Sequence, residues 1–200
     1  MKKRFFIPLI ALLNVCAGYL IYYTAHLGST GEYNDWTKYN LSVVGYWDGH
    51  ERELIIWGLI TAAVFVTFLL LLWQLSDRRP KAVLYFAIAA GAFLSVGVFV
   101  PYQHEAIDSI ISNIHIACSF NAPMCVAIAL ILLTVRQLKT KSGMILMVFL
   151  VAGLGGAALI FIKYTIITTV LELYTISALT AYMDAMAAVL FVRKAEKIKS

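Results

Sequence analysis

The sequence predicts an all-α membrane protein, a polytopic bundle of six transmembrane helices that forms a single domain over residues 1–200. Composition is the first of three observations that predict it. Of the 200 residues 62% are apolar and only 14% are charged, and the mean hydropathy is +0.83. A soluble globule of 22.2 kDa cannot hide that much apolar surface from water, since small domains leave much of their surface exposed. The composition therefore excludes a soluble enzyme, a disordered chain, a disulfide-stapled secreted domain and a nucleic-acid binder.

Apolar segments of the right length are the second observation. A transmembrane helix needs about 20 mostly apolar residues, and six stretches meet this requirement, namely 5–23, 54–74, 82–100, 110–135, 144–162 and 168–192. The first begins like a signal peptide, but its apolar run continues past Cys16 to Tyr23, so we expect an uncleaved helix. Residues 24–53 are expected to form an outer loop, and the other connections are short, so consecutive helices should pack as antiparallel neighbours.

The third observation is the placement of the basic residues. Thirteen of the sixteen Lys and Arg residues flank one set of helix ends, and only Lys38, Arg52 and Lys163 flank the other. Basic residues accumulate in cytoplasmic loops, so we expect both termini to be cytoplasmic and residues 24–53 to face outward. This rule also explains the net charge of +5, which is therefore not a nucleic-acid-binding patch.

Polar residues at the start of the fourth predicted helix are the first candidate site. On a helix that turns by 100° per residue, one face would carry His104, Asp108, Ser112, His115 and Ser119. Polar groups in lipid usually face a bundle interior or a water-filled cavity, so this face offers a general base and an acid. In the alternative, Asp108 or Ser109 caps the helix, and only Ser112, His115 and Ser119 stay in line. We expect His115 to line the bundle interior and to form a hydrogen bond with residues 24–53 or with the sixth predicted helix.

Residues 104–108 (His-Glu-Ala-Ile-Asp) also imitate a zinc-protease motif, with His115 as a further candidate ligand. Ligand atoms must lie about 2 Å from a zinc ion. His104 and His115 are separated by about 16 Å of rise on a straight helix. We therefore expect that they do not bind one metal ion together, and we expect no cofactor.

Two acids inside the sixth predicted helix are the second candidate site. Glu172 lies near its outer end and Asp184 lies just past its midpoint. An ionised Asp at that depth costs at least about 2.5–3.5 kcal/mol, so Asp184 is expected to face a neighbouring helix and a polar partner. Asn14 and Asn121 lie at similar depth. A structural hydrogen-bonded cluster and a pathway for protons or cations both remain open.

Three short patterns occur in a fixed order along the chain. Asn40-Leu41-Ser42-Val43-Val44-Gly45 precedes the second predicted helix, Gly97-Val98-Phe99-Val100-Pro101 ends the third, and Asn113-Ile114-His115-Ile116-Ala117 opens the fourth. This order resembles the DRAM/Frag/Sfk group of six-helix membrane proteins and their bacterial relatives. That family shows a Ser-x-x-Gly turn, a Phe-Pro-like helix end and a His at these places. The chain departs from the pattern where Val100 separates Phe99 from Pro101, and where Trp57 replaces a common Asn.

The resemblance implies six spans with cytoplasmic termini and a link to lipid anchors or lipid distribution. It singles out Ser42, Gly45 and His115 as functional residues. The sequence thus favours a lipid-interacting membrane protein with an outward polar cap, and membrane lipid as its partner. The first alternative is a membrane-embedded hydrolase or acyltransferase that uses His104, Asp108, Ser112 and His115. The second is a small transporter that uses Asp184 and Glu172.

Overall fold

The computed structural model describes residues 3–77, 79–103 and 108–196. Within these ranges the chain forms seven helices and no strand, and six of the helices are long and apolar enough to cross a membrane. The predicted all-α fold class with six spans is therefore confirmed. The long helices are α1 (Lys3–Gly28), α3 (Glu51–Leu75), α4 (Lys81–Phe99), α5 (Ile110–Val135), α6 (Lys141–Tyr164) and α7 (Thr169–Glu196).

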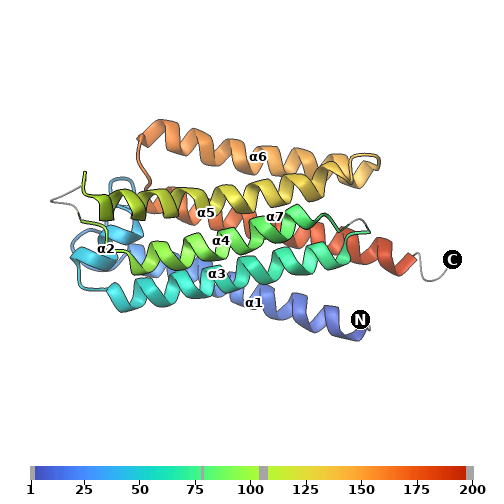
Figure 1. Cartoon of the computed structure of the whole chain (residues 1–200), viewed down its shortest axis with the longest axis horizontal. Coiled ribbons are helices and arrows are strands. Elements are labelled where there is room, and N and C mark those ends of the chain that lie inside the picture. Colours follow the sequence, from blue (N-terminus) through green and yellow to red (C-terminus); the bar gives the residue numbers. More distant parts are fainter. Residues whose placement is uncertain (1–2, 78, 104–107, 197–200) are drawn as a thin grey trace.

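The segment predicted as an outer loop is more ordered than expected. It contains the last turn of α1, the first turn of α3 and a short helix, α2 (Leu41–Trp47). Figure 1 shows α2 at one end of the bundle and both chain termini at the opposite end. We refer to residues 29–50, which contain α2 and join α1 to α3, as the cap.

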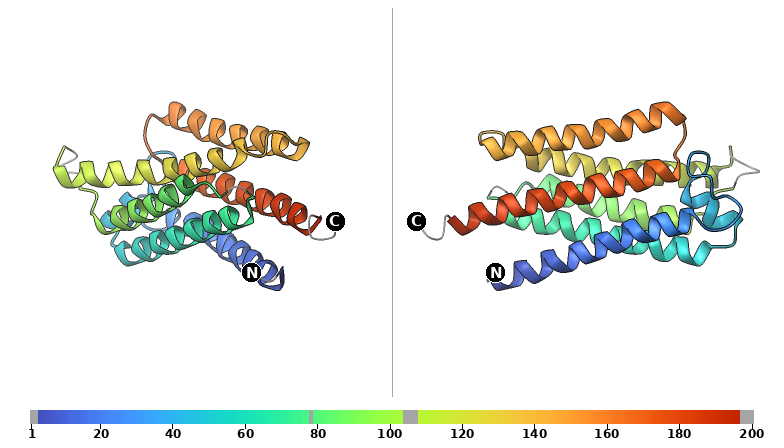
Figure 2. Two further views of the ribbon diagram at one scale, coloured as in Figure 1. Left: turned by 45° about the vertical axis from the view of Figure 1, so that its right-hand side comes forward. Right: turned by 180° about the vertical axis from the view of Figure 1, so that it is seen from behind.

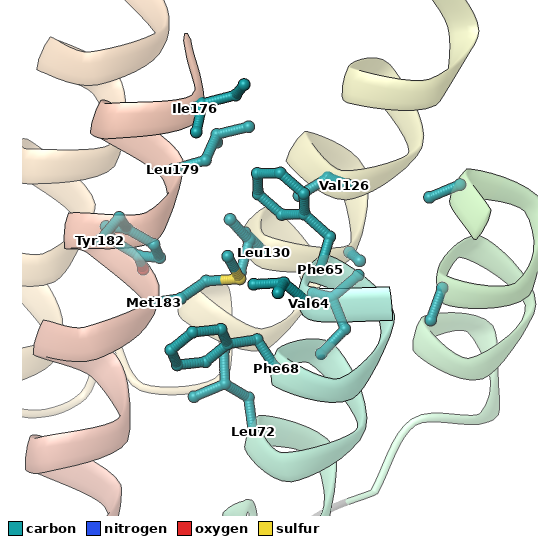
Figure 3. Packing of buried hydrophobic residues seen from close by; sticks show 14 of the residues in the cluster. Val64, Phe65, Phe68, Leu72, Val126, Leu130, Ile176, Leu179, Tyr182 and Met183 are labelled. Carbon is teal, nitrogen blue, oxygen red and sulfur yellow. The ribbon is translucent and has the colours of Figure 1, made fainter. Parts of the chain in front are cut away.

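Helix α3 lies at the centre of the bundle. It packs against α1, α2, α4, α5 and α7, and Phe68, Leu69 and Leu72 are completely buried on it. Figure 3 shows its apolar side chains meeting those of α5 and α7. Ile56, Leu59 and Leu70 are exposed on α3, so this helix is apolar both where it packs against its neighbours and where it faces outward.

Some buried polar side chains in this core form hydrogen bonds between helices. The indole Nε1 of Trp57 on α3 donates to Thr24 Oγ1 on α1 at 2.8 Å. Thr134 on α5 and Tyr182 on α7 share a hydrogen bond between their hydroxyl groups. Because the hydrocarbon region offers no water, a polar side chain there needs a partner within the protein. Trp57 has such a partner in Thr24.

Helix α6 lies at the edge of the bundle, beside α5 and α7 (Figure 2). Only Gly143, Leu146 and Leu150 are buried along its length. Its outward face exposes large apolar side chains, among them Ile145, Val148 and Val151. This exposure suits a helix surrounded by lipid chains, which solvate apolar side chains as well as a protein core does.

Candidate functional site

The cap is held against the bundle by the short helix α2. Its first five residues, 41–45, are buried. Asn40 provides the N-cap, because its side-chain oxygen accepts a hydrogen bond from the backbone N–H of Val43 at 3.0 Å. Gly45 faces Leu54 of α3 so closely that a Cβ at this position would lie 2.6 Å from a Leu54 methyl carbon. The absence of a side chain at Gly45 therefore sets how near α2 approaches α3.

The beginning of α7 holds the other side of the cap. The carbonyl of Tyr39 accepts hydrogen bonds from both the N–H (2.8 Å) and the hydroxyl (2.9 Å) of Thr169. Glu172 reaches across and accepts the backbone N–H of Leu41 with its Oε2 at 2.9 Å. Glu172 thus supplies an acceptor to the first turn of α2, whose N–H groups have no partner within the helix.

His115 joins the cap to α4 and α5. Its Nε2 lies 2.9 Å from Ser42 Oγ on α2, and its Nδ1 lies 2.7 Å from the carbonyl oxygen of Val100 at the end of α4. The His115 side chain is only 4% exposed. A carbonyl oxygen can only accept a hydrogen bond, so Nδ1 carries the proton and Nε2 of the neutral ring accepts the proton of Ser42. The prediction that His115 lines the bundle interior and contacts residues 24–53 is confirmed.

Two tyrosines flank the His115 ring. The ring centroid of Tyr102 lies 5.6 Å from that of His115, and Tyr46 on α2 approaches edge-on at 6.4 Å. The Tyr46 hydroxyl donates to the carbonyl of Val98 at 2.8 Å. Burial, with a smaller effect of the Glu51 carboxylate, raises the pKa of Tyr46 above its ordinary value, so the phenol keeps the proton that it donates.

A row of aromatic rings continues from Tyr102 over the surface of the cap. Trp47 stacks on Tyr102 with 6.4 Å between ring centroids, and Tyr33 meets Trp47 edge-on at 5.2 Å. Asp48 lies beside this row, because its Oδ2 accepts the backbone N–H of Tyr33 at 3.1 Å. We call the three rings of Tyr33, Trp47 and Tyr102, together with the adjoining carboxylate of Asp48, the aromatic row.

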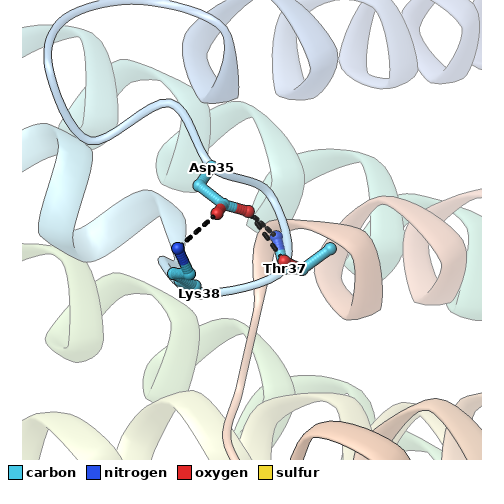
Figure 4. Close-up of polar contacts among 3 residues, drawn as sticks. All are labelled: Asp35, Thr37 and Lys38. Atoms are coloured by element: carbon cyan, nitrogen blue, oxygen red, sulfur yellow. Dashed lines mark hydrogen bonds and ion pairs between the residues drawn. The ribbon is translucent and has the colours of Figure 1, made fainter.

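A separate polar turn shapes the far side of the cap. The carboxylate of Asp35 accepts hydrogen bonds from the hydroxyl and the backbone N–H of Thr37 and pairs with Lys38 at 3.1 Å (Figure 4). These interactions, the Thr37 hydroxyl first, lower the pKa of Asp35 to about 2. The carboxylate therefore stays ionised at any physiological pH.

The predicted polar stripe on the fourth span does not form in full. Ser109 is the N-cap of α5 and accepts the N–H of Ser112 at 3.1 Å. Asp108 therefore precedes the helix, where its side chain is exposed. The hydroxyl of Ser112 bonds to the backbone of Gln103 rather than to His115. The capped alternative is the one observed, since Ser112, His115 and Ser119 stay on one side of α5, with Ser119 Oγ 3.4 Å from His115 Nε2.

His104 and Glu105 lie outside the described residues. Across the rest of the chain that the structure describes, no three His, Cys, Asp or Glu side chains gather as a metal site would require. Asp108, Ser112 and His115 are thus not brought together as a catalytic set. His115 is instead bonded to Ser42 of α2.

Asp184 has the interhelical partner that its depth in the membrane requires. The carboxamide of Asn14 on α1 faces it, and with its nitrogen toward α7 it donates to both carboxylate oxygens. Of the two asparagines at similar depth, Asn14 is therefore the partner. Asn121 instead donates to the carbonyl of Ala117 in its own helix. With Asp184 bonded to Asn14 and Glu172 bonded to Leu41, both intramembrane acids have structural roles.

Several site features carry no signal in the sequence. The carbonyl of Val100 orients His115 through its backbone, and any residue type offers the same acceptor. In the sequence, Tyr46 and Tyr102 resemble ordinary interfacial aromatic residues. Only the fold places their rings beside His115. Comparisons with known proteins found no match to this chain among family models, curated proteins or solved structures.

Proposed function

We propose that this chain is a lipid-interacting integral membrane protein whose cap faces outward and binds the ammonium group of a lipid headgroup. Six apolar helices support the membrane location. The thirteen-to-three distribution of basic residues supports the outward orientation of the cap, because the cap end carries the minority. The resemblance to DRAM/Frag/Sfk proteins, which are linked to lipid anchors and lipid distribution, supports the lipid partner.

The aromatic row carries this proposal. Tyr and Trp side chains concentrate at the membrane–water interface, where lipid headgroups lie. The faces of their rings attract ammonium groups, and a carboxylate beside them adds a direct charge interaction. Tyr33, Trp47 and Tyr102 are all half-buried rather than enclosed.

The charge around the row favours a cation over an anion. The cap and the first turn of α3 carry five acids (Glu32, Asp35, Asp48, Glu51, Glu53) and two bases (Lys38, Arg52). Lys38 is already paired with Asp35. This excess of negative charge attracts the ammonium of an ethanolamine or choline headgroup and repels a headgroup that carries only phosphate.

Native mass spectrometry of the detergent-purified chain tests the proposal. The protein is mixed with equal amounts of phosphatidylethanolamine and phosphatidylglycerol of the same acyl composition, and the lipids that remain bound are counted. We expect preferential retention of phosphatidylethanolamine, reduced by Tyr102→Ala. The matched control is Tyr85→Ala, which removes a 69% exposed tyrosine from α4, away from the cap. Equal retention of both lipids, or equal effects of the two substitutions, would overturn the proposal.

A further inference from the structure

A chain of hydrogen bonds runs from the Ser42 hydroxyl to the His115 imidazole and from there to the Val100 carbonyl, which orients the ring. We propose that Ser42 is a nucleophile that takes the acyl group from an ester-linked lipid chain, with His115 as its general base. The proposal rests on the proposed function for its substrate class, a lipid, and goes beyond it by assigning a covalent reaction.

The distances meet the requirements for an activated serine. A nucleophile and its base must lie within about 2.6–3.2 Å, with the base oriented by a third group. The 2.9 Å contact between Ser42 Oγ and His115 Nε2 lies within this range, and the 2.7 Å bond from Nδ1 to Val100 fixes the ring and its tautomer. Val100 therefore takes the place of the carboxylate that orients the histidine in many serine hydrolases.

The location of the pair suits a lipid ester. His115 is the sixth residue of α5, about 8 Å of helix rise from the end that carries the cap. That depth corresponds to the region between headgroups and acyl chains, where the ester bonds of a glycerolipid lie. The rings of Tyr46 and Tyr102 shield the imidazole from bulk water. Ser42 is 8% exposed and His115 is 4% exposed, so both members of the pair are buried in the free protein.

The reaction balances with water as the only co-reactant. The Ser42 proton passes to His115 Nε2 while Oγ bonds to the ester carbonyl carbon. The tetrahedral adduct then breaks its bond to the glycerol oxygen, which leaves with the proton from His115. Water attacks the acyl-serine with His115 again as base, which releases a fatty acid and restores the Ser42 hydroxyl.

Two serines of α5 lie on the same side of that helix as His115, but they are not equivalent to Ser42 of α2. Ser119 Oγ lies 3.4 Å from the same nitrogen, at the outer limit of a hydrogen bond. The Ser112 hydroxyl both donates to and accepts from the backbone of Gln103 and is fully buried. Ser112→Ala is therefore the matched control, because it removes a hydroxyl from the same helix face that does not bond to His115.

A fluorophosphonate probe tests the nucleophile on the full-length protein in detergent, with peptide mapping by mass spectrometry to locate the adduct. We expect one adduct on Ser42, none in Ser42→Ala, and labelling at least 100-fold slower in His115→Asn. The Ser112→Ala control should label at the rate of the unmodified protein. Ser42→Cys, tested with iodoacetamide, keeps a nucleophile at the site and tests the dependence on His115 if Ser42→Ala fails to fold.

The absence of a Ser42 adduct in folded protein, an adduct on Ser119 instead, or an unchanged rate in His115→Asn would overturn the proposal. A second measurement separates it from the proposed function. Fatty-acid release is followed from vesicles of phosphatidylethanolamine and of phosphatidylglycerol. No release from either vesicle overturns the lipid substrate even when Ser42 is labelled. Equal release from both supports the nucleophile and contradicts the ammonium preference of the cap.

Discussion

His115 and Ser42 are 73 residues apart in the chain, yet Nε2 of the first lies 2.9 Å from Oγ of the second. This bond connects α5 to the cap through a histidine that is already fixed by α4. Three separate segments thus meet at one imidazole ring, and the position of the cap depends on it.

Removing the imidazole should therefore destabilise the protein. In His115→Ala the Ser42 hydroxyl and the Val100 carbonyl lose their partner, and each buried polar group left unpaired costs about 1–3 kcal/mol. Ser42→Ala should cost less, because it removes the hydroxyl and leaves Ser119 near the ring. Thermal unfolding in detergent measures both. The double variant should cost less than the sum of the single ones, whereas strict additivity would mean that the two side chains do not interact.

Gly45 should not tolerate even one added methyl group. A Cβ there would lie 2.6–3.1 Å from three atoms of the Leu54 side chain, and overpacking of this kind costs about 1–3 kcal/mol. Gly45→Ala should lower the unfolding temperature, and Leu54→Ala in the same chain should recover part of the loss. Gly155→Ala is the control, because a Cβ at Gly155 meets nothing within 4 Å. Equal effects at both glycines would show that α2 is not packed tightly against α3.

Asp184 should tolerate a neutral polar replacement but not an apolar one. Asp184→Asn keeps an acceptor for the Asn14 carboxamide, so we expect near-normal stability. Asp184→Leu leaves Asn14 without its partner between α1 and α7, at an expected cost of about 1–3 kcal/mol. Adding Asn14→Leu to Asp184→Leu should restore stability. Thermal unfolding of the unmodified protein and the three variants measures these differences in stability. Equal unfolding temperatures for Asp184→Asn and Asp184→Leu would mean that Asp184 needs no partner.

Glu172 should control how firmly the cap is held. Glu172→Gln retains an oxygen that accepts the N–H of Leu41, whereas Glu172→Ala removes it. We expect trypsin to cleave after Lys38, within the cap, and after Arg52, in the first turn of α3, several-fold faster in the Ala variant. The Gln variant should resemble the unmodified protein. Unchanged cleavage in the Ala variant would show that the bonds between Tyr39 and Thr169 hold the cap by themselves.

Orientation can be checked by labelling single cysteines in intact cells, after replacement of Cys16, Cys118 and Cys125. Asn34 is exposed in the cap and Asp77 is exposed at the opposite end of the bundle. An impermeant maleimide should label Asn34→Cys and should label Asp77→Cys only after the membrane is opened. Labelling of Asp77→Cys from outside would reverse the orientation inferred from the basic residues.

The long helices could be read from the sequence, because transmembrane helices depend on local composition. A run of apolar residues long enough to span the bilayer must form a helix, whatever its neighbours are, since every backbone group needs an internal hydrogen bond. The predicted spans accordingly differ from α1 and α3–α7 only near their ends. The need of Asp184 for a partner also followed from its depth alone.

Only the tertiary structure decided how the candidate residues combine. Ser112 and Asp108, close to His115 in sequence, bond elsewhere or lie exposed, while Ser42 reaches it from a short helix inside a segment predicted as a loop. Helical periodicity places residues of one helix on a common face, but it carries no information about which face of another segment will meet them. That pairing is set by packing, by the lack of a side chain at Gly45 and by backbone acceptors such as the Val100 carbonyl. Every residue type has a backbone carbonyl, so the sequence does not show which one will accept a hydrogen bond from a distant side chain.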